Sequence, residues 1–250
     1  MTLTAARVQA VLAPRETRFF EVVDSTNDIA REWLRAGAPC GAVVVADEQR
    51  RGRGRMGRAW HTPPGAALAV SVILHPPAAA LPRLSMLAAV AVCDLLESLG
   101  CAPVGIKWPN DVQIGGRKIC GVLVEADWER DRLLGAVVGI GLNVRVDFSG
   151  TELGGSAVSL ADALDSPPGR QDLLAGLVAR VDEWYDRLQT PTLYTAWRAR
   201  LTTLGQQVTI SGAGEAVAGV AESVDEQGAL LVREAGGALR RVVAGDIALG

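Results

Sequence analysis

The stretch that decides the fold runs from residue 104 to residue 144 and reads VGIKWPNDVQIGGRKICGVLVEADWERDRLLGAVVGIGLNV. It contains four apolar, β-like runs, which are Val104–Trp108, Val112–Ile114, Ile119–Ala126 and Leu133–Val144. Gly115-Gly116 stands between the second and third runs, where a tight hairpin turn needs residues that accept a positive φ. Consecutive hairpins predict mixed or antiparallel pairing rather than a doubly wound parallel sheet.

The segments before this stretch alternate between strand and helix patterns. Strands are predicted at Arg18–Val23, Ala42–Ala46 and Ala66–Leu74. Apolar residues at helical spacing predict helices within residues 29–37 and 84–96. The polar segment Asp47–Gly65 is predicted to be a long loop, and loops of that length are usually functional or mobile.

The segments after residue 144 show helical patterns first and then a series of short strand patterns. Helical spacing predicts two helices, Arg170–Gln189 and Leu193–Leu204. Short strands follow at Gln207–Ile210, Ala216–Val224, Ala229–Glu234 and Leu239–Val243. Short strands between glycine-containing turns suit a small barrel with an SH3-like layout. We therefore predict an α+β protein with a mixed-sheet domain over residues 1–204 and a small β-barrel domain over residues 205–250.

The composition excludes several classes of protein. The chain has 250 residues, a hydrophobic content of 49% and a formal net charge of −3. These values exclude disorder as the main state and argue against a surface that binds nucleic acid throughout. No run of 18 apolar residues and no secretory pattern is present, so we expect a cytoplasmic protein with no membrane partner. The four cysteines form no C-x-x-C pair, which argues against a zinc site or a disulfide framework.

The densest functional signal is the Arg-Gly loop, residues 50–60, which reads RRGRGRMGRAW. Its first nine residues hold five arginines and three glycines, and like charges so close favour an anionic ligand. Glycine lets the backbone approach a ligand, and arginine offers paired donors to phosphate or carboxylate oxygens. A nucleic-acid tract or a solvated loop is the alternative. The position between two predicted buried strands and the closing Trp60 favour a ligand loop.

Two further motifs contain the only two lysines among the 25 basic residues. Lys107 opens K-W-P-N-D, a turn at a strand end where side chains can project into a cleft. Lys118 lies in G-R-K-I-C-G-V-L-V-E, either as an edge charge or as a cation aimed into a pocket. By themselves, Ser25-Thr26-Asn27 indicates a helix cap and residues 139–144 indicate only a strand.

Taken together and in order, five motifs resemble those of the biotin protein ligases, the biotin–[acetyl-CoA-carboxylase] ligases. They are S-T-N, G-R-G-R-x-G-R-x-W, K-W-P-N-D, G-R-K-x-x-G-[IV]-L-V-E and G-x-G-x-N. The resemblance implies an α+β catalytic domain related to class II aminoacyl-tRNA synthetases, which binds biotin and ATP, followed by the small barrel. It also implies that biotin and ATP, with Mg²⁺, give biotinyl-5′-AMP and pyrophosphate. Biotin would then pass to one lysine of a biotin carboxyl carrier protein domain of acetyl-CoA carboxylase or a related carboxylase.

The chemistry and the resemblance together suggest roles for individual residues. Joining a carboxylate to the α-phosphate of ATP needs fixed cations, and the predicted catalytic residues are Lys118, Arg53 and Arg55. The predicted biotin-binding residues are Ser25, Thr26, Asn27, Gln49, Gly52, Arg53, Gly54, Arg55 and Lys118. The predicted adenylate-binding residues are Arg53, Arg55, Arg58, Trp60, Lys107, Asn110, Asp111, Lys118 and Asn143. Asp111 is the candidate Mg²⁺ ligand.

Two alternative functions would require different features in the sequence. A lipoate or octanoate ligase of the same superfamily should lack the Arg-Gly loop and K-W-P-N-D as written. A non-enzymatic nucleic-acid binder would need more basic surface than a net charge of −3 supplies. The few residues before Arg18 are too short for the winged-helix DNA-binding domain of many family members, so we expect a monofunctional ligase that binds no DNA. Met56 occupies a loop position that is often basic in the family. The sequence makes no prediction of the oligomeric state.

Overall fold

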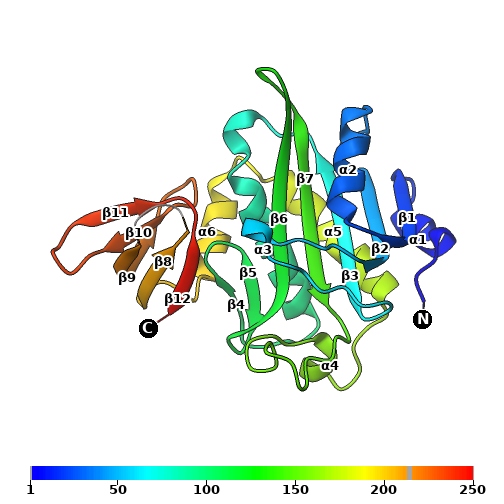
Figure 1. Ribbon diagram of the computed structural model, residues 1–250. Helices are drawn as coiled ribbons and strands as arrows, with labels where there is room; N and C mark the ends of the chain where they lie inside the picture. Colours follow the sequence, from blue (N-terminus) through cyan, green and yellow to red (C-terminus); the bar gives the residue numbers. More distant parts are fainter. Residues whose placement is uncertain (1, 213–215, 250) are drawn as a thin grey trace.

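The larger sheet of the protein has seven strands in the order β1-β2-β3-β7-β6-β5-β4 (Figure 1). The structure is a computed structural model that describes residues 2–212 and 216–249. The strands are β1 (Thr17–Val23), β2 (Val43–Gln49), β3 (Ala67–Leu74), β4 (Val104–Lys107), β5 (Asp111–Ile114), β6 (Arg117–Glu129) and β7 (Arg132–Asn143). β1 pairs with β2 in parallel, and the other neighbours pair antiparallel. The predicted mixed sheet is therefore confirmed.

Glycine conformation explains the hairpin that starts β6. Gly115 and Gly116 join β5 to β6 with φ values of 57° and 79°. Both values lie in the left-handed region that a two-residue hairpin turn requires and that glycine adopts without steric cost. The turn thereby fixes the register that places Lys118 near the start of β6, opposite Gln113 of β5.

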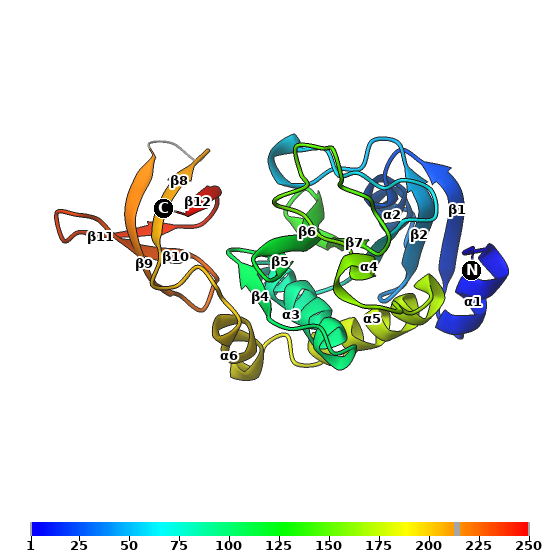
Figure 2. The same ribbon diagram turned by 90° about the horizontal axis from the view of Figure 1, so that it is seen from below.

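Helices cover both faces of this sheet. They are α1 (Ala5–Leu12), α2 (Thr26–Arg35), α3 (Arg83–Ser98), α4 (Leu160–Ala163), α5 (Arg170–Tyr185) and α6 (Pro191–Ala199), with 3₁₀ turns η1 (Arg55–Gly57) and η2 (Ala78–Ala80). Figure 2 shows α3 and α5 running along one side of the sheet. Leu68, Val70 and Val72 of β3 join the main hydrophobic core on that side, whereas Ile73 packs in the smaller core with α2. Because side chains alternate across a strand, each strand serves both faces.

The smaller sheet has five antiparallel strands in the order β11-β10-β9-β8-β12 and lies to one side of the larger sheet (Figure 2). The strands are β8 (Gln207–Ser211), β9 (Val217–Val224), β10 (Leu230–Arg233), β11 (Leu239–Val242) and β12 (Asp246–Leu249). Within the described residues β11 and β12, the two end strands, do not pair with each other. The predicted SH3-like layout is thus an open, curled sheet here rather than a closed barrel, because β12 pairs with β8 alone.

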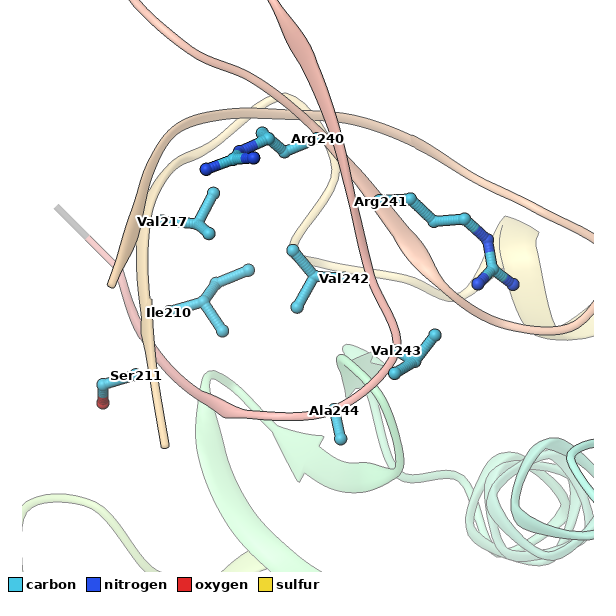
Figure 3. A pocket seen from close by; sticks show the side chains of 8 residues that line it. All are labelled: Ile210, Ser211, Val217, Arg240, Arg241, Val242, Val243 and Ala244. Carbon is cyan, nitrogen blue, oxygen red and sulfur yellow. The ribbon is translucent and has the colours of Figure 1, made fainter. Parts of the chain in front are cut away.

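A pocket of about 350 Å³ lies inside this curl, where Ile210, Val217 and Val242 point inward (Figure 3). Its lining residues are Ile210, Ser211, Val217, Arg240, Arg241, Val242, Val243 and Ala244. None of them belongs to the residue sets that the sequence predicted for ligands.

Several element boundaries differ from the sequence predictions. β2 continues to Gln49, so the polar loop that was predicted to start at Asp47 starts three residues later. The two helices predicted to end at residues 189 and 204 end at Tyr185 and Ala199. Helix α1 was not predicted, although Thr4 caps it by accepting a hydrogen bond from the backbone nitrogen of Arg7 at 3.3 Å. Among the described residues, no helix combines the length and apolar character needed to cross a membrane.

Candidate active site

One face of the larger sheet collects polar residues and glycines. On β6 and β7, every second residue faces the main core, including Cys120, Val122, Val138 and Ile140. The residues between them, on the opposite face, include Gly121, Glu125, Gly139, Gly141 and Asn143. Gly121 and Gly141 are direct cross-strand partners, so two glycines lie side by side in the middle of this face. We call this face the site face, because the predicted ligand residues gather over it.

The N-terminus of α2 brings Thr26 and Gln49 together. Ser25, Thr26 and Asn27 are at most 4% exposed. The backbone nitrogen and the hydroxyl of Thr26 donate to Gln49 Oε1 at 2.8 and 3.0 Å. Ser25 occupies the N-cap position, but its side chain makes no capping hydrogen bond. The helix-cap interpretation therefore holds for the position of Ser25 and not for its hydroxyl.

The side-chain amide of Asn27 is held by protein groups. Its Nδ2 donates to Glu125 Oε2 at 2.7 Å, and Ser71 Oγ lies 2.6 Å from its Oδ1. A side chain on Gly139 would collide with the same amide, so this glycine is required by close packing. Asn27 thus contacts protein groups on several sides, and its first role is to orient the start of α2.

The Arg-Gly loop folds back on itself as a narrow hairpin. Its ends are joined by bridges between Gln49 and Thr62 and between Arg53 and Ala59. The backbone nitrogen of Trp60 donates to Gly52 O at 2.8 Å. A Cβ atom on Gly52 would lie 2.5 Å from Trp60 O, so only glycine fits at this crossing.

The last three arginines of this loop differ in their contacts. Arg53 makes a two-point contact with Asp28, at 2.8 and 2.5 Å. Arg58 pairs with Asp246 of β12. Arg55 has no ion-pair partner within residues 2–212 and 216–249. Burial lowers the pKa of the Arg55 guanidinium, an effect that Asp111 and Asp246 oppose.

Trp60 lies flat on the two paired glycines of the site face. A Cβ atom on Gly121 would approach Trp60 Cζ3 to 3.0 Å, and one on Gly141 would collide with the indole nitrogen. The same nitrogen is buried without a hydrogen-bond partner in the described part of the chain. Lys118 Nζ lies 5.5 Å from the centre of the Trp60 ring system. The indole therefore sits beside the predicted catalytic lysine.

The K-W-P-N-D turn meets Lys118 through a carboxylate. Asp111 Oδ1 lies 2.7 Å from Lys118 Nζ, and both side chains are about one third exposed. Asn110 is 2% exposed and donates from Nδ2 to Val122 O at 2.8 Å. Its Oδ1 has no hydrogen-bond partner in the described structure. Lys107 is half-buried at the end of β4 and pairs in register with Asp111.

Asn143 ends β7 on the same face. It is 3% exposed and donates from Nδ2 to Val158 O at 3.2 Å. Val158 in turn donates its backbone N–H to Lys118 O at 3.0 Å, so Asn143 is linked to the strand segment that carries the lysine. The structure thus brings the predicted residues of α2, the Arg-Gly loop, β5, β6 and β7 to one face.

Sequence reasoning missed several residues that hold this arrangement. Glu125, which contacts Asn27, also lies 3.2 Å from Arg31 and 3.9 Å from Arg53. Asp127, 5% exposed, accepts two hydrogen bonds from Arg31, and this interaction holds the pKa of the Asp127 carboxyl below its usual value. The final Glu of the motif around Lys118 was a visible signal for Glu125, whereas nothing local pointed to Asp28.

The comparisons with known proteins agree with this geometry. Residues 19–143 match the Biotin/lipoate A/B protein ligase family, and residues 203–250 match the Biotin protein ligase C terminal domain. The biotin–[acetyl-CoA-carboxylase] ligase of Paracoccus denitrificans is 38% identical over 233 residues, which cover 88% of this chain and 94% of that protein. The chain belongs to the biotin protein ligase family.

Further relatives extend over most of the ligase chain. The biotin–[acetyl-CoA-carboxylase] ligase of Mycobacterium tuberculosis is 36% identical over 256 residues, covering 96% of this chain and 92% of that protein. The structure of the biotin protein ligase from Aquifex aeolicus in complex with biotin and ATP superposes with a TM-score of 0.80 at 27% identity. That match covers 94% of this chain and 98% of the other.

Proposed function

We propose that this ligase activates biotin with ATP and transfers it to a specific lysine of a biotin carboxyl carrier protein domain. In the first step a biotin carboxylate oxygen attacks the α-phosphorus, the bond to pyrophosphate breaks, and biotinyl-5′-AMP forms. In the second, the uncharged amine of the carrier lysine attacks the acyl carbon, AMP leaves, and the amine loses a proton. Family membership and the relatives named above support this activity. The observation that carries it is the position of Lys118 beside Trp60, which covers a glycine floor formed by the paired residues Gly121 and Gly141.

Biotin would bind at the α2 side of the site face. Thr26 and Gln49 present a buried pair of hydrogen-bonding groups there, and Ser25 and Asn27 flank them. A ureido ring carries both donors and an acceptor, so it can replace or join such hydrogen bonds. Gly52 and Gly54 would let the loop backbone approach the acid-bearing tail.

The carboxylate and the α-phosphate would meet near Lys118. Two anions approach each other in this step, so cations held in place lower its barrier. Lys118 is bound to Asp111 in the free protein and would exchange that partner for the ligand anions. Arg55 lies near Asp111 and pairs with no carboxylate of the described residues, so its charge would serve the ligand anions. Lys107 and Arg58 would contribute positive charge to the phosphates.

The nucleotide would lie toward β5 and β7. Trp60 is half-buried and would offer an aromatic face for the adenine. Asn110 and Asn143 are buried amides at the ends of neighbouring segments and would border the nucleotide.

A Mg²⁺ ion would enter with the nucleotide. Asp111 provides one carboxylate, and the unpartnered Oδ1 of its neighbour Asn110 is a second hard oxygen. No group of three or more metal-binding side chains occurs in the described residues. This fits a magnesium ion held by one carboxylate and substrate phosphates, which is a common arrangement for nucleotide-bound Mg²⁺. The ion, when bound, would neutralise phosphate charge.

Residues 1–204 would form the biotin- and ATP-binding catalytic domain and residues 205–250 the C-terminal SH3-like domain. The carrier domain would be that of acetyl-CoA carboxylase or a related enzyme, and the cytoplasm would be the compartment. Neither alternative function gains support. The motifs around the Arg-Gly loop are those of biotin ligases, and Arg53 and Arg58 of the loop contact carboxylates, which reduces its open basic surface.

Biotin-dependent exchange of pyrophosphate into ATP tests the activity directly. The wild-type protein should show exchange with biotin and not with lipoate or octanoate. Lys118→Ala should lower the exchange rate by about 100-fold or more, as expected when a fixed cation at developing charge is removed. Arg117→Ala is the control, because Arg117 is the exposed neighbour of Lys118. Absence of biotin-dependent exchange in the wild type would show that the proposed function is wrong.

A further inference from the structure

Asp28 has no assigned part in the reaction, yet it holds the first half of the Arg-Gly loop. Both of its carboxylate oxygens accept hydrogen bonds from the Arg53 guanidinium, at 2.8 and 2.5 Å. Such two-point contacts fix the orientation of a guanidinium as well as its distance. We propose that Asp28 is a positioning residue that acts through Arg53 to set the place of Arg55 over the site face. This inference rests on the proposed function.

The charge around Arg53 supports a structural use of its side chain. Glu125, which pairs more closely with Arg31, lies 3.9 Å from the same guanidinium, so Arg53 faces a second carboxylate besides Asp28. The hydrogen bond from Arg53 holds the pKa of the Asp28 carboxyl below its usual value, and the same contact raises the pKa of Arg53. A guanidinium held in this two-point contact would have to break it before it could bind an incoming anion in the same way.

Arg55 differs from Arg53 in the same loop. It is largely shielded from solvent and faces no pairing carboxylate in the described residues. Its guanidinium therefore has charge available for a phosphate or carboxylate. The sequence treated Arg53 and Arg55 as equivalent catalytic cations, whereas the structure separates an anchor from a ligand-facing cation.

The anchor also connects the loop to the predicted biotin end of the site. Asp28 follows Thr26 and Asn27 in the first turn of α2. Glu125 contacts both Asn27 and Arg53. A shift of the α2 N-terminus would therefore move the loop anchor with it, so the ligand groups of α2 and the position of Arg55 are mechanically joined.

The test compares Asp28→Asn with Glu222→Gln. The second variant removes the same kind of two-point contact, between Glu222 and Arg233 in the small sheet, at 2.7 and 2.8 Å. In ligand-free protein, Asp28→Asn should speed amide exchange of residues 50–60, and Glu222→Gln should not. In pyrophosphate exchange, Asp28→Asn should lower kcat/KM for ATP about tenfold, and Asp28→Glu should restore part of the loss.

A double-mutant cycle shows whether the effect passes through Arg53. In an Arg53→Gln background, Asp28→Asn should cause no further loss of exchange activity, because the contact is already gone. An equal further loss in that background would overturn the proposal. So would wild-type amide exchange of residues 50–60 in Asp28→Asn, or in Arg53→Gln should the first variant not fold. The amide-exchange measurement does not depend on ligase activity. It therefore tests whether Asp28 holds the loop through Arg53 even if the proposed function is wrong.

Discussion

At the scale of single residues, glycine determines where aromatic and amide side chains can rest. Gly121 and Gly141 have no side chain, so Trp60 can pack directly on the sheet backbone, and Gly139 allows the same for Asn27. A Cβ atom at any of these positions would push the covering side chain away from the sheet. The glycines of β6 and β7 therefore shape the site face as directly as its charged groups do.

Gly141→Ala should displace Trp60, because the new methyl group would occupy the space of the indole nitrogen. A displaced loop residue at a reacting centre lowers turnover roughly 10- to 100-fold. Pyrophosphate exchange and the unfolding midpoint would both be measured. Gly236→Ala is the control, since a Cβ atom there meets nothing within 4 Å. Equal activity of the two variants would contradict the assigned role of the glycine floor.

Asp127 should make the free energy of unfolding depend on pH in the acidic range. Its pKa is held below the usual value by the hydrogen bond from Arg31, so the folded carboxyl binds a proton less readily than the unfolded one. The stabilisation that ionised Asp127 gives to the folded state is complete above about pH 4, the usual pKa of this carboxyl in the unfolded chain. It is lost as the pH falls through the lower pKa of the carboxyl in the folded protein. The free energy of unfolding of Asp127→Asn should therefore vary less with pH below about 4 than that of the wild type.

Urea unfolding at a series of acidic pH values measures this dependence. Asp131→Asn, at the exposed tip of the β6–β7 hairpin, is the control for removing one carboxylate. Parallel curves for wild type and Asp127→Asn would show that the Arg31 contact contributes no acid sensitivity.

At the scale of elements, a buried ion pair joins α5 to both ends of the loop region. Arg170, 5% exposed at the start of α5, lies 2.6 Å from Asp47 of β2. The N–H direction is poor for a hydrogen bond at that oxygen, so the contact is mainly ionic. Arg170 also donates to Ala67 O at the start of β3. One side chain thereby fixes the strand before the Arg-Gly loop and the strand after it.

Arg170→Met should destabilise the protein by about 3 kcal/mol, the lower end for a broken buried pair, because it leaves the half-buried Asp47 without its cation. The free energy of urea unfolding is the measurement. Arg132→Met is the matched control, since Arg132 pairs with Glu129 while both side chains are more than 60% exposed. Such an exposed pair should contribute less than about 1 kcal/mol. A similar loss for both variants would refute the role of the buried pair.

At the scale of the whole molecule, the small sheet is fastened to the segments that carry the site. Trp108 of the K-W-P-N-D turn donates from Nε1 to Gly228 O at 2.8 Å, and Tyr194 of α6 donates to Val224 O at 2.7 Å. Arg58 of the Arg-Gly loop pairs with Asp246. Two predicted ligand segments therefore contact the C-terminal sheet, which gives that sheet a structural part in the site.

Trp108→Phe should loosen this attachment while keeping most of the buried apolar area. Loss of the indole hydrogen bond should cost about 1 kcal/mol. Amide exchange of β9 and β10 should become faster, and the global free energy of unfolding should fall by that amount. Trp128→Phe is the control, because Trp128 is 49% exposed at a hairpin tip. Unchanged exchange in β9 and β10 would contradict the attachment.

Features that depend on neighbouring residues could be predicted from the sequence, whereas contacts between distant residues could not. Gly115-Gly116 and the apolar runs around it predicted the hairpins correctly, because turn conformation and side-chain alternation are local properties. The anchor of Arg53 could not be predicted, since Asp28 is 25 residues away in the chain and adjacent only after α2 packs on the sheet. The small barrel was predicted from short strands between glycine-containing turns, whereas closure of a barrel depends on whether its end strands meet.

By itself, the sequence determined the mixed sheet, the order of the motifs and the family to which they belong, because these depend on residue type and spacing. The tertiary structure alone decided which of the loop's cations are held by a carboxylate. Arg53, Arg55 and Arg58 are chemically identical along the chain, and their contacts differ because Asp28 and Asp246 meet the first and the last of them. Pairing between charges depends on distance in space, and folding sets that distance.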